Sequence, residues 1–108
     1  MLTIDGTLLF GLEQDGKLQK DFTLRLATLE DVEEAIEAAG PGASNARMAR
    51  HKWARCLTRL GDIPAAKITA DLLASLPAQE FGVLQAAEDE LLKKLVASSA
   101  ETPAASEK

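Results

Sequence analysis

The sequence predicts an α+β fold, mostly α, in which an N-terminal β-hairpin packs on a bundle of about four helices. Apolar residues alternate on both sides of an Asp-Gly pair within the first 26 residues. Further along, apolar residues recur at three- and four-residue steps between Gly and Pro breakers. The hydrophobic content is 46%, with one Trp, three Phe and no Tyr. This composition favours helices packed through aliphatic side chains over an aromatic-rich sandwich.

A chain of 108 residues is long enough for one small domain. We expect residues 1–97 to form that domain and residues 98–108, which end in ETPAASEK, to be a disordered tail. A single Cys cannot form an internal disulfide and fits a reducing compartment. The N-terminus has no basic segment typical of a secretory signal, and no apolar run reaches the ~18 residues of a membrane span. We therefore expect a cytoplasmic protein with no membrane partner.

The hairpin is predicted over Thr7–Leu26, with its turn at Gln14–Lys17, where Asp15-Gly16 suits positive φ angles. Alternation places one set of apolar residues on a common face: Leu8, Phe10, Leu12, Phe22, Leu24 and Leu26. The segment Leu2–Ile4 could add a short third strand, since Asp5-Gly6 is a second possible turn. Two such strands are marginal alone, so helices must cover the apolar face.

The first helix is predicted to begin after Thr28, which suits an N-cap with Asp31 in the capping-box position, and to end at Gly40-Pro41-Gly42. Its expected core residues are Leu29, Val32, Ile36 and Ala39. Its expected solvent-facing residues are Glu30, Asp31, Glu33, Glu34 and Glu37. These acids could bind a basic partner, but a solvated helix surface is the favoured interpretation.

The second helix is predicted over Ser44–Gly61, capped by Ser44 or Asn45 and ended by Gly61. Its expected buried face is Ala46, Ala49, Trp53, Cys56, Leu57 and Leu60. Its expected polar face is Arg47, Arg50, His51 and Arg55, with Lys52 and Arg59 at the borders. This segment carries five of the twelve basic residues and no acid, so it stands apart from an otherwise acidic chain.

Two further helices are predicted. Thr69 can cap a two-turn helix that carries Leu72, Leu73 and Leu76, and Pro77 breaks it. The last helix runs from about Ala78 to Ala97, with Lys93 and Lys94 in its final turns. Its expected buried face is Phe81, Leu84, Ala87, Leu91, Leu95 and Val96.

The sequence offers no motif for catalysis, for a cofactor or for a metal. His51 is the only His, and a zinc site would need further ligands at metal spacing. Cys56 lies on the predicted apolar face one turn after Trp53, where a structural thiol is favoured over a nucleophile. Gly40-Pro41-Gly42 lacks the strand before it and the Lys-Ser/Thr after it that a phosphate loop requires. We therefore predict a protein that is not an enzyme.

The basic face of the second helix is the candidate partner-binding surface, formed by Arg47, Arg50, Lys52, Arg55 and Arg59. Three uses are open for it. It could be a solvated face, a docking surface for an acidic or helical protein partner, or a nucleic-acid contact. Nucleic acid is the least favoured, since the rest of the chain holds seven basic and seventeen acidic residues. That surface also lacks an exposed aromatic residue to stack bases.

Two passages together resemble the tail assembly chaperones of Mu-like phages and prophages. The first is LEQDGKLQKDFTLRLATLEDV (Leu12–Val32), where a Gly turn leads into a strand of the form K-D-F-x-L-R-L-x-T and an acidic helix. The second is RLGDIPAAKITADLLASLPAQEFGVLQAAEDELLKKL (Arg59–Leu95), with R-L-G-x-I-P and I-T-x-x-L-L-x-x-L. The sequence departs from the family pattern at Ala27 and Ala70, where Pro is common, and at Glu80, where Asp is expected.

The resemblance implies a non-enzymatic assembly factor made in the bacterial host cytoplasm. Such proteins bind the tape measure protein, keep that long helical molecule soluble, and leave as the tail tube polymerises around it. Possible further partners are the tail tube protein and a longer, frameshifted form of the chaperone itself. Two alternatives stay open. One is a small nucleic-acid-binding regulator that uses residues 44–60, and the other is a generic protein adaptor.

Overall fold

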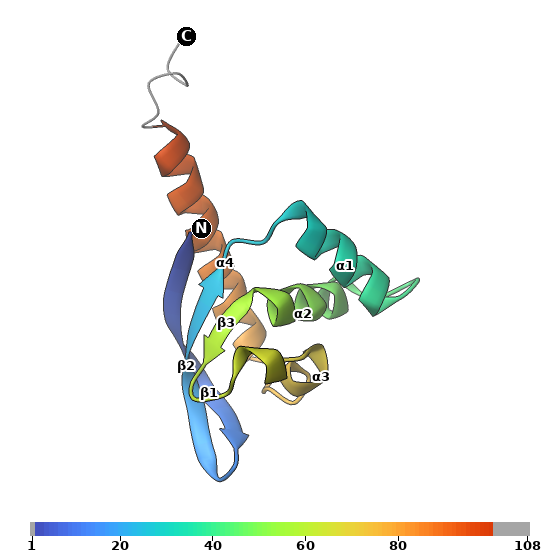
Figure 1. Ribbon diagram of the computed structural model, residues 1–108, viewed down its shortest axis with the longest axis vertical. Helices are drawn as coiled ribbons and strands as arrows, with labels where there is room; N and C mark the ends of the chain where they lie inside the picture. Colours follow the sequence, from blue (N-terminus) through green and yellow to red (C-terminus); the bar gives the residue numbers. More distant parts are fainter. Residues whose placement is uncertain (1, 101–108) are drawn as a thin grey trace.

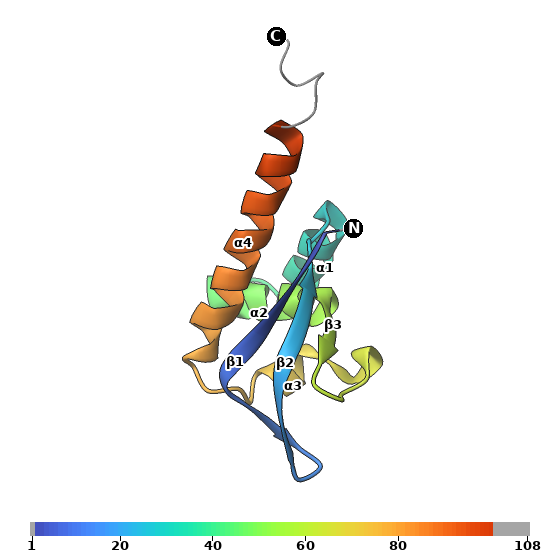
Figure 2. The same ribbon diagram turned by 90° about the vertical axis from the view of Figure 1, so that its left-hand side faces the viewer.

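The computed structural model describes residues 2–100 (Figure 1). In chain order its elements are β1 (Thr3–Gln14), β2 (Lys17–Arg25), α1 (Leu29–Ala39), α2 (Asn45–Cys56), β3 (Leu57–Leu60), a 3-10 turn (Ala65–Lys67), α3 (Ala70–Leu73) and α4 (Glu80–Ala100). Within residues 2–100, three strands form one antiparallel sheet in the order β1-β2-β3. α4 lies along β1, while α1 and α3 pack on α2 (Figures 1 and 2). The predicted α+β class, with an N-terminal hairpin packed on helices, is confirmed.

The predicted hairpin turn is confirmed. Asp15 and Gly16 have φ angles of 54° and 75°, the left-handed pair that a type I′ turn requires. Gln14 pairs with Lys17 across it. On β2, Phe22 and Leu24 are buried, as the alternation predicted.

The first strand is longer than predicted. β1 starts at Thr3, so Thr3 and Ile4 of the possible separate strand at Leu2–Ile4 belong to β1, and Asp5-Gly6 makes no turn. Gly6 lies opposite Phe22, where an added Cβ would come within 2.5 Å of the ring carbon Cζ. The glycine therefore makes room for an aromatic ring across the ladder.

A bulge interrupts β1 and changes which residues face the core. The register between β1 and β2 shifts between Thr7 and Leu12, and Gly11 takes a φ of 83°. Leu8 and Leu12 remain buried, but Phe10, predicted to face the core, is exposed. A bulge adds an unpaired residue to one strand. The alternation of buried and exposed side chains is therefore interrupted within it, and Phe10 lies in this interrupted stretch.

The predicted helix over Ser44–Gly61 is wrong in its last turn. α2 ends at Cys56, and Leu57–Leu60 forms β3, which pairs with β2. Leu57 and Leu60 are buried as predicted, but from a strand. Their three-residue spacing fits a helical face, so only pairing with β2 distinguishes the two structures. Gly61 does have a positive φ, of 56°, yet it follows β3 and caps no helix.

The first helix buries a different face from the predicted one. Its capping box between Thr28 and Asp31 is confirmed. The residues it buries are Asp31, Ala35 and Ala39. Of the predicted core residues, only Ala39 is buried, whereas Leu29, Val32 and Ile36 are exposed. α1 packs on α2 through small side chains, and this contact leaves the bulky apolar stripe beside it uncovered.

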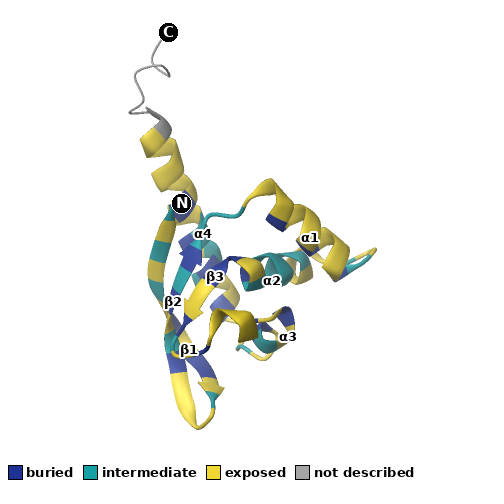
Figure 3. Ribbon diagram, viewed as in Figure 1, coloured by how far each residue is buried: buried dark blue, intermediate teal, exposed yellow. Residues whose placement is uncertain are grey.

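The last two helices match the prediction in part. Thr69 caps α3, which has only four residues where two turns were predicted. In α4, the predicted core residues Leu84, Ala87 and Leu91 are buried, but Phe81, Leu95 and Val96 are exposed. After Leu91 the last turns of α4 extend past the end of the sheet, which leaves Leu95 and Val96 uncovered (Figures 2 and 3). Helix α4 continues through residues 98–100 of the predicted tail, and residues 101–108 lie outside the described part.

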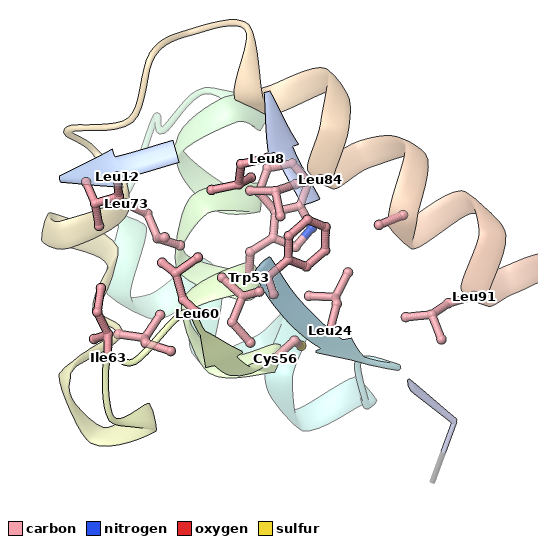
Figure 4. Packing of buried hydrophobic residues seen from close by; sticks show 14 residues of the cluster. Leu8, Leu12, Leu24, Trp53, Cys56, Leu60, Ile63, Leu73, Leu84 and Leu91 are labelled. Carbon is pink, nitrogen blue, oxygen red and sulfur yellow. The ribbon is translucent and has the colours of Figure 1, made fainter. Parts of the chain in front are cut away.

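The core lies between the sheet and the helices α2 and α4. Figure 4 shows Trp53 of α2 among Leu8, Leu24 and Leu84, which come from both hairpin strands and α4. The Trp53 and Phe81 rings meet edge to face with centroids 5.0 Å apart, a favourable aromatic geometry. Among the described residues, no helix is long and apolar enough to cross a membrane.

Candidate functional site

The five predicted basic residues do not form one free surface. Arg50 Nη1 donates to the Ala70 carbonyl at 2.8 Å, which ties α2 to α3. Lys52 Nζ lies 2.6 Å from Glu88 Oε2, which ties α2 to α4. Arg47 is the exception in the described part of the chain, since its exposed side chain makes no hydrogen bond or ion pair there.

The other two predicted residues contact β2 or α1. Arg59 Nε donates to Thr23 Oγ1 at 3.3 Å across the β2–β3 pair. Arg55 Nε donates to Asp31 Oδ1 at 3.0 Å. Four of the five candidates therefore hold elements of this fold together, which leaves fewer charges for a partner.

Asp31 is the buried centre of a partly exposed ion-pair cluster that joins α1 to β2 and α2. Arg25 of β2 donates to it twice, from Nη1 at 2.6 Å and Nη2 at 3.0 Å. That hydrogen-bonded pair is the main reason the pKa of Asp31 lies well below its usual range, and it raises the pKa of Arg25. The sequence prediction placed Asp31 in solvent, whereas it is 2% exposed. Arg25 was not singled out by the sequence, because only the fold brings it to Asp31.

Cys56 lies at the same cluster, with its Sγ 3.9 Å from Asp31 Oδ2. Burial raises the pKa of the Cys56 thiol to about 11. A thiol that stays protonated at neutral pH is a poor nucleophile, so the predicted structural role agrees with its environment.

A second buried acid, Glu80, is bound by the bulge in β1. Its Oε1 accepts from the Leu9 amide, and its Oε2 accepts from the amides of Phe10 and Gly11, each at 2.8 Å. Successive backbone N–H groups in a bulge form an anion-binding concavity, and here the anion comes from the first residue of α4. This contact fixes the start of α4 against the sheet. The glycine inside the β1 pattern was the sequence signal for the bulge.

The exposed apolar residues of α1 form one wall of an open cavity, which we call the α1 groove. α2 forms its floor, and the first turns of α4 form its second wall. The cavity holds about 350 Å³, and its apolar lining is Val32, Ala35, Ile36, Met48, Ala49 and Phe81. Ile36 is 51% exposed and Phe81 40%, so both walls carry bulky apolar surface.

A neighbouring pocket shares Phe81 with the α1 groove. It lies between α2, α3 and α4 and also holds about 350 Å³. Arg47 and Arg50 stand at its edge, and Trp53 lines it. Within residues 2–100 the buried Trp53 Nε1 has no hydrogen-bond partner. Phe81 therefore lines both apolar depressions.

The sequence analysis missed the α1 groove because it assigned the bulky residues of α1 to the core. Ala35 and Ala39 could have indicated the true packing face, since two alanines four residues apart allow close helix contact. In the described part of the chain, no group of three or more His, Cys, Asp or Glu residues could hold a metal ion. Binding through apolar surface is what the arrangement best supports chemically.

Comparisons with known proteins place no relative beside this chain: no family model, no curated protein and no solved structure matches it.

Proposed function

We propose that this protein is a non-enzymatic phage tail assembly chaperone that binds a helical segment of the tape measure protein. It would act in the bacterial host cytoplasm and release its partner as the tail tube assembles. The observation that carries the proposal is the α1 groove, whose walls expose Val32, Ile36 and Phe81. An amphipathic helix is the natural occupant of a groove between helices, because it buries one apolar stripe.

The resemblance at Leu12–Val32 and Arg59–Leu95 supports the same class of protein. The first passage includes β2 and the start of α1, and the second includes α3 and most of α4. Both therefore contribute elements that form or support the groove. An open, half-exposed apolar groove suits the moderate affinity that a chaperone needs in order to release its partner.

The internal contacts of the basic residues weigh against the nucleic-acid alternative. Arg50, Lys52 and Arg55 each bind a group of this chain. The remaining exposed cation on α2 without such a contact in the described residues is Arg47. A single free arginine is a small electrostatic footprint for nucleic acid on an acidic protein.

Co-expression with the tape measure protein tests the proposal. We expect the wild-type chain to keep the tape measure protein in the soluble fraction and to co-purify with it. The variant Ile36→Gln should lose most of that effect, since it removes an apolar side chain at the groove wall while keeping a good helix former.

Leu18→Gln is the matched control for that experiment. Leu18 lies on the hairpin away from the groove and is 58% exposed, close to the exposure of Ile36. The Leu18→Gln variant should keep the tape measure protein in the soluble fraction as well as the wild-type chain does. An equally insoluble and unbound tape measure protein with the wild-type chain would reject the proposed function.

A further inference from the structure

The positions of residues around the α1 helix show which charges lie beside the α1 groove. At about 100° per residue, Leu29, Val32 and Ile36 fall within about 60° of one another and form a single stripe. Glu33 adjoins that stripe on the side away from the core, followed by Glu37. All five side chains are exposed. The outer rim of the groove is therefore acidic.

The acids of this rim are uncompensated. Within the described residues, neither Glu33 nor Glu37 makes a hydrogen bond or an ion pair. The cation that lines the groove, Lys52, is already paired with Glu88 of α4 at 2.6 Å. The groove thus offers apolar surface beside free negative charge, with its positive charge neutralised by an acid of the same chain.

The α4 wall adds to the same surface. Phe81, Gln85, Leu92 and Val96 are spaced by four, seven and four residues, so they share one face of α4. Leu92 and Val96 are exposed, which extends the apolar wall beyond the cavity. Asp89, next to this face, accepts a hydrogen bond from Gln85 and adds a second acidic edge.

We propose that the occupant of the α1 groove is an amphipathic helix with a basic flank, whose lysines or arginines pair with Glu33 and Glu37. The inference rests on the proposed function only in taking a helix as the occupant. It moves the expected partner surface from the basic face of α2 to the acids of α1, for which the sequence analysis favoured a solvated surface over a basic partner. Complementary charge beside an apolar contact gives orientation and selectivity to such docking.

Two synthetic peptides of about 18 residues test this chemistry directly. Both carry the same Leu and Ala stripe and neither contains Trp, but one has only Lys on its flanks and the other only Glu. Trp53, the chain's one Trp, reports binding by fluorescence because its ring contacts Phe81 at the groove. We expect the Lys-flanked peptide to bind at least about 10-fold more tightly, with an advantage that shrinks in high salt.

A matched pair of charge reversals locates the contact. Glu33→Lys should lower the affinity for the Lys-flanked peptide several-fold. The double variant Glu33→Lys with Glu37→Lys should bind the Glu-flanked peptide more tightly than the Lys-flanked one. Glu34→Lys makes the same charge change one residue away, on the opposite side of α1 from the stripe. It should leave the preference intact. Circular dichroism of each variant checks that the fold is retained.

Several outcomes would overturn the inference: equal affinity for both peptides, no binding of either, or equal effects of Glu33→Lys and Glu34→Lys. A dimer seen by sedimentation across a range of protein concentrations, and converted to monomer by Ile36→Gln, would also overturn it. In that case a second copy of the chain would fill the groove. Failure of the proposed function looks different. If the Lys-flanked peptide binds but the tape measure protein does not, only the function is rejected.

Discussion

Glu80 and Gly11 are 69 residues apart in sequence, yet the Glu80 carboxylate accepts a buried hydrogen bond of 2.8 Å from the Gly11 amide. The same carboxylate accepts the two preceding amides of the bulge. One side chain thus satisfies three backbone donors that the sheet leaves unpaired. The position of α4, and with it one wall of the α1 groove, depends on this contact.

Replacing Glu80 should therefore cost more stability than any surface acid does. We expect Glu80→Gln to lower the free energy of unfolding by about 2–3 kcal/mol, because its amide group presents N–H donors to other donors. Urea unfolding followed by circular dichroism measures this. Glu90→Gln is the control, since Glu90 makes only an exposed pair with Lys93 and should cost less than about 0.5 kcal/mol. Equal losses would contradict the role given to Glu80.

The Asp31 cluster predicts a specific pH dependence. The folded-state pKa of Asp31 is depressed by Arg25, so its contribution is fully present above the unfolded-state pKa of about 4. That contribution is lost as the pH falls below this value toward the folded-state pKa. We expect Asp31→Asn to cost about 3 kcal/mol at pH 7. The difference from wild type should shrink in acid when urea unfolding is repeated between neutral pH and about pH 2. A constant difference would show that Asp31 stabilises the fold by some means other than its charge.

Cys56 should be unreactive until the protein unfolds. Its buried thiol, with a pKa of about 11, carries almost no thiolate at pH 8. We expect a disulfide reagent to modify the native protein at least about 100-fold more slowly than the protein in urea. Rapid modification of the folded chain would mean that the core at α2 opens readily.

Two glycines should respond oppositely to alanine. Gly61 has a φ of 56°, and an added Cβ would overlap the Gln19 side chain. That side chain accepts a hydrogen bond from the Asp62 amide. Gly61→Ala should lower the free energy of unfolding by about 2 kcal/mol. Gly82 lies in α4 with open space around it, so Gly82→Ala should raise that energy by about 0.5–1 kcal/mol. Thermal unfolding of both variants decides the sign.

Local signals in the sequence were sufficient for turns and caps. Asp15-Gly16 and the capping box of Thr28 with Asp31 act within three or four residues, so the sequence alone determines them. The strand at Leu57–Leu60 could not be predicted in this way. Its two leucines fit a helix as well as a strand, and the decision lies with β2, over thirty residues earlier.

The candidate site was less predictable than the fold, for a related reason. Periodicity shows that Val32 and Ile36 share a face, but it cannot show whether that face is covered. Asp31, which pairs with Arg25 and Arg55, is buried together with Ala35 and Ala39 of α1. Arg25 and Arg55 thus bind a group of this chain, and the exposed side of α1 carries apolar and acidic residues.

The most direct test of the α1 groove as the chaperone surface is site-specific photo-cross-linking during co-expression with the tape measure protein. A photoreactive phenylalanine analogue replaces Ile36 in one strain and Leu18 in another, both exposed positions. We predict a cross-linked product with the tape measure protein from position 36 and none from position 18. Cross-linking from position 18 alone, or from neither position while the two proteins still co-purify, would contradict the assignment of the groove.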